Sequence, residues 1–451
     1  MSNMKAEQQY IDLFAQCEDL VCRHSTPVMN ALRADALANF ERLGFPSTRS
    51  EDYKYTDVAQ AFAPDYGLNI NRVAIPVNPY DVFRCDVPNL STSLYFVVND
   101  TFYDKDLPKA HLPEGVYAGG LKAFTEQYPE IASKYYGKAA PSSKDGIIAL
   151  NTMLAQDGFV VYVPKNVVVE RPIQLVNIFR NDVDTMANRR VLVIMEPHSE
   201  AKLLVCDHSI DDVKFLATQV VEIFAEEGAR FDYYDLEESS ESTTRFSSVH
   251  VKQAASTNVL VNGITLTNGL TRNNYYVELN GEYAESTLCG MSVLDKEQQM
   301  DTYSHITHAV PNCTSNELFK NVLNDHAVGV FSGRILVKED AQKTAAYQTN
   351  RNLCATREAR MYSKPQLEEI YADDVKCSHG MTTGQLDENA LFYMQSRGIP
   401  RDEARMLLSV AFTSDVIDHV RLEALKDRLH KLVEKRFRGE LAKCAGCRIC
   451  K

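Results

Sequence analysis

The sequence predicts a mainly β protein, with a β-solenoid core between two α-helical regions. Runs rich in Val, Ile, Thr and Tyr, separated by polar turns, extend from about Ser93 to Gly384 and are typical of strands. A period of 27 to 31 residues without helices indicates coils stacked on one another. The repeating units begin near Glu200, Gly228, Ala255, Glu282, Cys313 and Asp340. A β-sandwich is the alternative, but its turns recur roughly every 8–12 residues without a longer period.

Length and composition indicate a large folded protein. At 451 residues the chain is too long for one ordinary core, so two or three domains or one elongated repeat are expected. The formal net charge of −13 argues against a nucleic-acid-binding protein of the usual basic kind. The N-terminus lacks the apolar core of a signal peptide, and no aliphatic run is long enough to span a membrane. Eleven cysteines without an export signal indicate reduced thiols in the cytoplasm.

The first region, residues 1–92, is expected to be helical and mixed. The stretch Ser25–Val28 supplies an N-cap, with Pro27 near the first helical position. Apolar residues then follow at four-residue spacing until Gly44–Pro46 ends the helix: Val28, Leu32, Ala36 and Phe40. The polar and aromatic stretch Thr48–Thr56 has no clear period, so it is expected to form a surface loop.

The strand-rich core is expected to span residues 93–386, and a second helical region residues 387–438. Asp387 caps a first helix that stops at Gly398, and Pro400 begins a second helix. Ser414–Asp415 begins a third, with an apolar stripe of Val416, Val420, Leu422, Leu425, Leu429, Leu432 and Val433. From Arg421 onward ten Lys and Arg residues stand against four Asp and Glu. This bias fits either a solvated helix face or a basic contact surface for an acidic partner.

The ends of a solenoid leave unpaired strand edges, which invite pairing with other chains. Either the terminal helices cover or flank these edges, or one edge adds onto a similar strand of a partner chain.

Cys377 and His379 are the strongest chemical signal in the sequence. They stand two residues apart in a strand-like run, so their side chains project from one face, roughly 6–7 Å apart along the backbone. A thiolate and an imidazole so placed can share a soft metal ion, or act as nucleophile and base. The plainer interpretation is a buried cysteine beside a hydrogen-bonded histidine. The same spacing recurs in Cys22–His24 and Cys206–His208, so spacing alone has little specificity.

The segment 439–451 is rich in cysteine. Cys444, Cys447 and Cys450 have the local spacing of iron–sulfur ligand runs and are tentative metal ligands. A tail of redox-sensitive thiols without metal is the alternative. His305 and His308 would lie on opposite faces of a strand, so they are expected to be structural. The sequence contains no phosphate-binding loop, nucleophile elbow or zinc-binding helix motif.

Several motifs together resemble the SufD branch of the SufB/SufD family of iron–sulfur cluster assembly proteins, over nearly the whole chain. They are Leu43–Pro46 with Glu51–Thr56, Phe331–Val337 with Gln348–Cys354, and Tyr371–Gly380 with Gly384–Glu388 and Leu391–Ile399. The Lys-Cys-Ser-His-Gly run within the last group is more typical of SufD than of its sister SufB.

The resemblance implies a right-handed parallel β-helix and a non-enzymatic scaffold role in the SufBCD complex. The partners implied are a SufB-like paralogue and the ABC-type ATPase SufC, and the complex builds nascent iron–sulfur clusters for acceptor proteins. Cys377 and His379 would lie at the junction with SufB and hold the transient cluster. The helices after Asp387 would dock the ATPase, so this chain itself is expected to bind no nucleotide.

Two features depart from the family pattern. The stretch Gln366–Tyr371 carries one residue more than usual near Glu368–Glu369, which predicts a β-bulge just before the site. The three-cysteine tail has no counterpart in the pattern. Two other functions stay open: a SufB-like scaffold acting as a homodimer, and a carbohydrate-active β-helix enzyme. The enzyme would need convergent carboxylates or basic residues in a groove, and none is evident.

Overall fold

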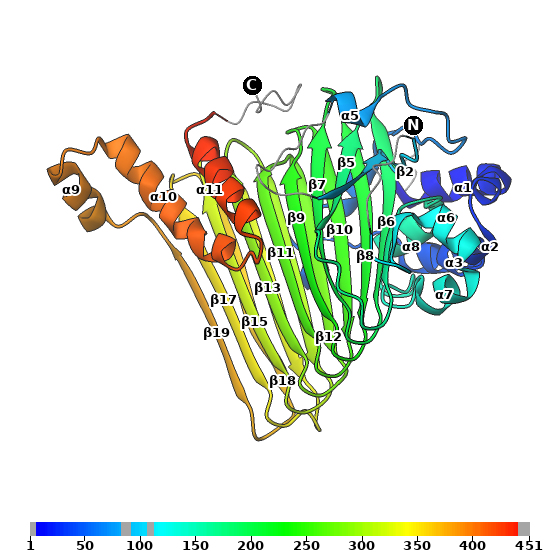
Figure 1. Ribbon diagram of the computed structural model, residues 1–451. Coiled ribbons are helices and arrows are strands. Elements are labelled where there is room, and N and C mark those ends of the chain that lie inside the picture. Colours follow the sequence, from blue (N-terminus) through cyan, green and yellow to red (C-terminus); the bar gives the residue numbers. More distant parts are fainter. Residues whose placement is uncertain (1–5, 83–91, 106–111, 441–451) are drawn as a thin grey trace.

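The structure, a computed structural model, describes residues 6–82, 92–105 and 112–440. It confirms the predicted fold class, because a parallel β-solenoid of about eight turns forms the body and helices flank it (Figure 1). Two sheets form the walls of the solenoid, and consecutive strands alternate between them. Within each sheet the successive coils pair in parallel.

The first sheet, in spatial order, is made of β19 (Lys376–Gly384), β17 (Ala345–Cys354), β15 (Thr314–Leu323), β13 (Glu285–Leu294), β11 (Asn258–Thr267), β9 (Arg230–Glu238), β7 (Glu200–Ser209), β5 (Ile173–Phe179), β1 (Ser93–Val98) and β2 (Thr101–Phe102). The second sheet is made of β18 (Arg360–Ile370), β16 (Val328–Val337), β14 (Gln299–His308), β12 (Leu270–Leu279), β10 (Thr243–Gln253), β8 (Phe215–Ala225), β6 (Thr185–Met195), β4 (Phe159–Val163) and β3 (Tyr117–Gly120).

The predicted sequence period corresponds to the coils of the first sheet. Six strands of this sheet each begin within five residues of a predicted unit start: β7, β9, β11, β13, β15 and β17. Two residues before each of these strands, one residue adopts a positive φ that turns the chain sharply from the second sheet to the first. These corner residues are His198, Gly228, Ser256, Tyr283, Asn312 and Lys343.

Side chains alternate between the inside of the solenoid and its outer faces. On β7, Leu203 and Val205 belong to the apolar core between the sheets. Leu204 and Cys206 point outward and belong to the cluster that the C-terminal helices cover. "Inner face" below means the face of a strand that points toward the other sheet.

Most of the N-terminal helices pack on the outer face of the second sheet, where Phe246 of β10 meets Phe62 at 5.2 Å between ring centroids. The short helix at residues 79–82 instead packs Tyr80 on Phe96 of the first sheet. The single helix expected after Pro27 is interrupted, because Ala31 and Leu32 separate two shorter helices. The helices of this part of the chain are α1 (Ala6–Arg23), α2 (Pro27–Asn30), α3 (Arg33–Leu43), the 3-10 helix η1 (Glu51–Tyr53), α4 (Val58–Phe62) and α5 (Pro79–Val82).

Three further helices lie inside the stretch whose sequence suggested strands: α6 (Leu121–Gln127), α7 (Pro129–Tyr135) and α8 (Gly146–Leu154). Helix α8 is capped by the Asp145 side chain and is buried on every side. A short apolar run of this kind has no period that separates a helix from a strand.

The stretch Thr48–Thr56 is more than the surface loop expected from the sequence. Tyr53 and Thr56 are buried. The Tyr53 hydroxyl donates to Asp145 at 3.0 Å, and the Thr56 hydroxyl donates to Asp301 at 2.5 Å. Tyr55 stacks on Tyr362 of β18 with 4.1 Å between the ring centroids. The stretch therefore forms a strap that crosses the outer face of the second sheet as far as its last strand.

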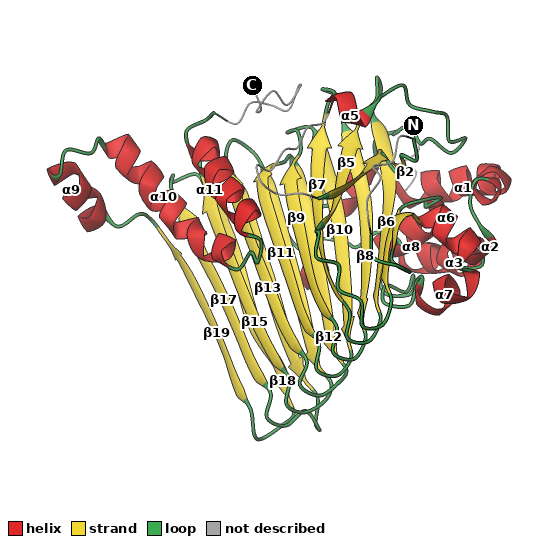
Figure 2. Ribbon diagram, viewed as in Figure 1, coloured by secondary structure: helices red, strands yellow, loops and turns green. Residues whose placement is uncertain are grey.

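The C-terminal helices are α9 (Glu388–Ser396), α10 (Arg401–Asp418) and α11 (Glu423–Phe437). The Asp387 cap is confirmed, since its carboxylate accepts from the Asn389 backbone at 2.9 Å. The predicted helix start at Ser414–Asp415 is wrong: the Ser414 hydroxyl donates to the Val410 carbonyl inside α10 rather than capping a new helix. Helices α10 and α11 bury most of the predicted apolar stripe against the first sheet, whereas α9 projects away from it (Figure 2).

Candidate functional site

The two ends of the solenoid differ in how their strand edges are covered. At one end β2 and β3 pair antiparallel with β1 and β4 and close the sheets. At the other end β18 and β19 are the last strands, and no described residue pairs with their outer edges (Figure 1). Most of the terminal helices lie on sheet faces and α9 projects away from the body, so none of them pairs with these two edges. We call this the open end, meaning the outer edges and inner faces of β18 and β19.

Cys377 and His379 both lie on the inner face of β19. Their neighbours on β17 are Ala346 and Gln348, which are buried between the sheets. Because paired residues in a parallel ladder point to the same face, the thiol and the imidazole project together, as the sequence predicts. No described coil follows β19, so this face lies at the rim of the solenoid, where His379 is exposed and Cys377 half-buried.

The surroundings of Cys377 favour a protonated thiol. The side chain packs against a small apolar cluster that includes Ala346 and Ala372. Burial raises the pKa of this thiol, and a backbone hydrogen bond at Ala346 opposes the change only in part. A free thiol of this kind is a poor nucleophile at neutral pH, but a soft metal ion can displace its proton. Metal ligation therefore suits this residue better than the nucleophile role that the spacing also allowed.

Met381 is a third soft side chain on the same face, and the sequence analysis missed it. It lies two residues beyond His379, in register with Asn350, and its side chain is 49% exposed. Because every second residue of a strand lies on the same face, counting two residues on from His379 would have found it. The inner face of β19 thus offers a thiol, an imidazole and a thioether in one row.

Two polar residues lie directly behind His379 inside the solenoid, in a column that crosses three coils. Glu317 of β15 pairs with Gln348 of β17, which pairs with His379. The Gln348 amide nitrogen donates to a Glu317 carboxylate oxygen at 2.5 Å. Burial raises the pKa of Glu317 to about 7, although hydrogen bonds to its carboxylate oppose the increase.

The β-bulge predicted before the site is present. Leu336 of β16 pairs with Glu368, whereas the next residue, Val337, pairs with Ile370. The structure therefore has one unpaired residue in β18 at the place where the sequence predicts the bulge.

The other candidate residues do not form a site. His308 is buried and its ring contacts the Ser315 hydroxyl at 2.8 Å, while His305 points to the opposite face and is partly exposed, as expected for structural residues. Cys206 and His208 are buried in β7. Within residues 6–82, 92–105 and 112–440, no three His, Cys, Asp or Glu side chains gather as a metal-binding group. Cys444, Cys447 and Cys450 lie outside the described residues.

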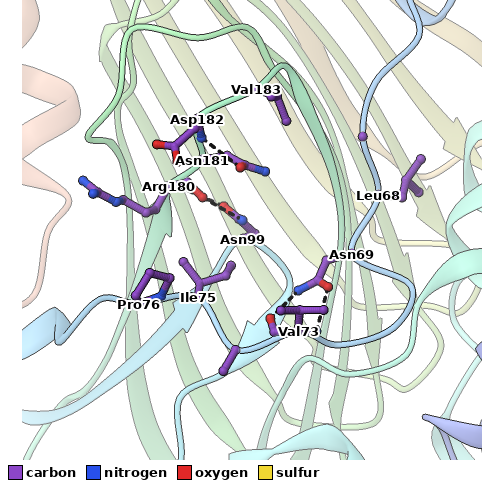
Figure 3. A pocket seen from close by; sticks show the side chains of 12 residues that line it. Leu68, Asn69, Val73, Ile75, Pro76, Asn99, Arg180, Asn181, Asp182 and Val183 are labelled. Atoms are coloured by element: carbon purple, nitrogen blue, oxygen red, sulfur yellow. Dashed lines mark hydrogen bonds between the residues drawn. The ribbon is translucent and has the colours of Figure 1, made fainter.

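A pocket of about 370 Å³ lies far from the open end, between the loops 67–76 and 180–183 (Figure 3). The side chain of Asn99 at its wall exchanges two hydrogen bonds of 3.0 Å with the backbone of Arg180. These polar groups stabilise the loops, so the pocket presents no converging reactive groups.

Comparison with known families agrees with the fold and with the motifs. The description "SufBD protein N-terminal region" matches residues 4–175, and "SUF system FeS cluster assembly, SufBD core domain" matches residues 178–412. The chain belongs to the SufBD family. Membership confirms the resemblance noted in the sequence and assigns the chain to a family of the SUF system for iron–sulfur cluster assembly.

Two relatives match most of the chain, and a third matches a shorter part of it. The chloroplastic protein ABCI7 of Arabidopsis thaliana is 30% identical over 402 residues, 86% of this chain and 82% of that protein. The iron–sulfur cluster assembly protein SufD of Bacillus subtilis is 24% identical over 454 aligned residues, 97% and 99% of the two chains. Escherichia coli SufD is 37% identical over 168 residues, 37% of this chain and 40% of that protein. Among the described residues, no helix is long and apolar enough to cross a membrane.

Proposed function

We propose that this SufBD-family chain is a non-enzymatic scaffold subunit of a SufBCD-type complex. It holds a nascent iron–sulfur cluster at the junction with a SufB-like partner and assists its transfer to acceptor proteins. The observation that carries the proposal is that Cys377 and His379 project together from the inner face of the last strand, at the rim of the solenoid. The complex works in the cytoplasm, where the eleven cysteines of the chain stay reduced.

The chemistry of the site suits a cluster that is held and then released. A thiolate and an imidazole are ligands that iron–sulfur centres accept. This chain supplies few ligands, so the partner completes the coordination and the cluster is retained less firmly than in a closed four-cysteine site. The cluster is the cargo of the complex, not a permanent cofactor of this chain.

The open end supports a strand-to-strand junction. The outer edges of β18 and β19 carry backbone donors and acceptors that no described residue uses, and such edges pair readily with a similar strand. Pairing with a SufB-like solenoid continues both sheets across the two chains and brings its residues next to Cys377 and His379.

Helix α9 is the proposed docking element for a SufC-like ATPase. It projects from the body (Figure 2), and Phe392 and Tyr393 on it are 74% and 59% exposed. Large exposed aromatic side chains are typical of contact sites. In this arrangement ATP binds to the partner, and this chain binds no nucleotide. Replacing both aromatic residues with Ala should abolish ATPase capture while the SufB-like partner still binds.

The function is tested by rebuilding clusters anaerobically on the complex with His379→Ala and Cys377→Ala variants. Both should assemble normally but retain several-fold less iron and sulfide. Ser378→Ala is the matched control, because Ser378 is exposed on the same strand and points to the other face. Normal cluster content in both variants would refute the proposal. The mass of the isolated chain and its iron content decide whether it is instead a self-pairing, SufB-like scaffold.

A further inference from the structure

The polar column behind His379 has a feature that packing alone does not explain. Gln348 is 1% exposed, and its amide nitrogen is bonded to Glu317. Its amide oxygen is buried and has no hydrogen-bond partner among the described residues. A buried carbonyl oxygen without a partner costs about 1–3 kcal/mol. Other buried amides among the described residues, such as Gln253 and Asn262, share this state, so the position of Gln348 beside His379 is what distinguishes it.

The surroundings of Gln348 keep its amide in one place. A Cβ atom added to Gly333 of the opposite sheet would lie 2.3 Å from the amide nitrogen, so the absence of a side chain at Gly333 makes room for the amide. Above its pKa of about 7 Glu317 is ionised and only accepts hydrogen bonds, so it selects the amide orientation in which nitrogen points toward it. The amide oxygen is then left for another donor.

His379 is the next side chain of the column after Gln348. The two residues are paired in register on neighbouring strands, and such strands lie about 4.8 Å apart. In the structure the His379 ring makes no hydrogen bond to the amide oxygen, but side chains paired at this spacing can meet when the exposed ring rotates inward. An imidazole that donates one N–H to a fixed acceptor presents the lone pair of its other nitrogen to a metal.

We propose that Gln348, oriented by Glu317, is a positioning residue that holds the His379 imidazole in the tautomer that binds the nascent cluster. This inference deepens the proposed function and rests on it. Gln348 itself touches no iron in this scheme, and its role is exerted entirely through the imidazole. Glu317 acts one step further away, by fixing which end of the amide faces His379.

The test compares Gln348→Met with Asn350→Leu in the full chain. Methionine keeps the unbranched shape of glutamine without the amide. Asn350 is also buried on the inner face of β17 but is paired with Met381, so its replacement disturbs the last coil without touching the column of His379. Equal melting temperatures of the two variants establish comparable folding.

The first readout is the tautomer ratio of His379, measured by NMR on chain labelled with ¹⁵N-histidine. His379→Gln assigns the signal among the 11 histidines. Gln348→Met should change the ratio about two- to tenfold, the equilibrium equivalent of one net hydrogen bond. Asn350→Leu should leave it unchanged, and Glu317→Gln should shift it in the same direction as Gln348→Met, because the amide is then free to turn.

The second readout is the loss of iron from the reconstituted complex to a chelator, which should be about tenfold faster with Gln348→Met than with Asn350→Leu. A tautomer ratio that does not respond to Gln348→Met overturns the inference. A shifted ratio combined with normal cluster content in His379→Ala refutes the proposed function instead, and with it the cluster-binding purpose of the contact. The two failures are therefore distinguishable.

Discussion

The middle coils of the solenoid and its open end both contain buried polar groups, but they satisfy them differently. In the middle, Arg245 donates to Asp207 at 2.6 Å and to Asp235 at 3.0 Å, and Arg189 donates to Asp207 at 3.1 Å. All four side chains are at least 96% buried. In the column behind His379, Glu317 has only neutral neighbours, the Gln348 amide and the Ser304 hydroxyl, and no cation pairs with it among the described residues.

The two regions differ in the pKa of their buried carboxyl groups. Burial alone would raise the pKa of Asp207, but Arg189 and Arg245 hold it below its usual value, so that carboxylate stays ionised and paired. Glu317 lacks such a partner and its pKa rises to about 7. The buried charges of the middle coils are paired, whereas the column behind His379 holds a carboxyl group without a cation and an amide oxygen without a partner among the described residues.

The largest expected effect is in the middle coils. Arg245→Met leaves Asp207, Asp235 and Glu237 buried near one another without their main cation, which should lower the free energy of unfolding by about 3–5 kcal/mol. Urea denaturation measures this change. Arg230, the first residue of β9, is exposed, so Arg230→Met is the control and should change stability by less than about 0.5 kcal/mol. Equal, small effects in the two variants would remove the distinction between the two regions.

The second effect is the pH dependence that Glu317 contributes. Its pKa rises from 4.5 to about 7 on folding, so its contribution to stability is complete below about pH 4.5 and is lost as pH rises through 7. The loss amounts to about 3 kcal/mol. Glu317→Gln should reduce the difference in unfolding free energy between pH 5 and pH 8 by about that amount. An unchanged difference would show that Glu317 is not desolvated. Glu339→Gln, at an exposed turn, should leave the difference as it is.

A third effect concerns the bare edge of β19. The Lys376 backbone N–H donates to Thr344, so the N–H groups of alternate residues, including Met381, point away from β17. Met381→Pro removes one outward donor and no bond within the chain, and edge strands tolerate proline. Binding of the SufB-like partner should weaken about tenfold, measured by titration calorimetry. Met381→Leu should bind normally, and unimpaired binding by the proline variant would exclude pairing through this edge.

The smallest expected effect is on stability at the site itself. His379 is exposed, so His379→Ala should change the unfolding free energy by no more than about 0.5 kcal/mol, although it should reduce cluster content several-fold. Thermal denaturation of the isolated variant checks this. A large loss of stability would mean that His379 is a packing residue and would support the plainer interpretation, in which it is a structural, hydrogen-bonded histidine.

The sequence predicts those features that depend on local period. The coil repeat, the shared face of Cys377 and His379 and the Asp387 cap all follow from residues near one another in the chain. The bulge in β18 was predicted from the resemblance to the family, because the sequence carries one residue more than the family pattern there. Features that depend on stacking were missed. Gln348 and Glu317 are 31 and 62 residues from His379, and only the exact register of three coils aligns them. The strap at Thr48–Thr56 was missed because its buried partners Asp145 and Asp301 lie 92 and 245 residues away in the chain.

The central claim is that the His379 imidazole binds iron at the open end. Its most direct test is electron–nuclear double resonance spectroscopy on a reduced, cluster-loaded complex in which only this chain carries ¹⁵N-histidine. The account predicts a ¹⁵N coupling to the cluster that disappears in His379→Ala and persists in Ser378→Ala. A loaded complex with no ¹⁵N coupling, or with one that survives the loss of His379, would contradict it.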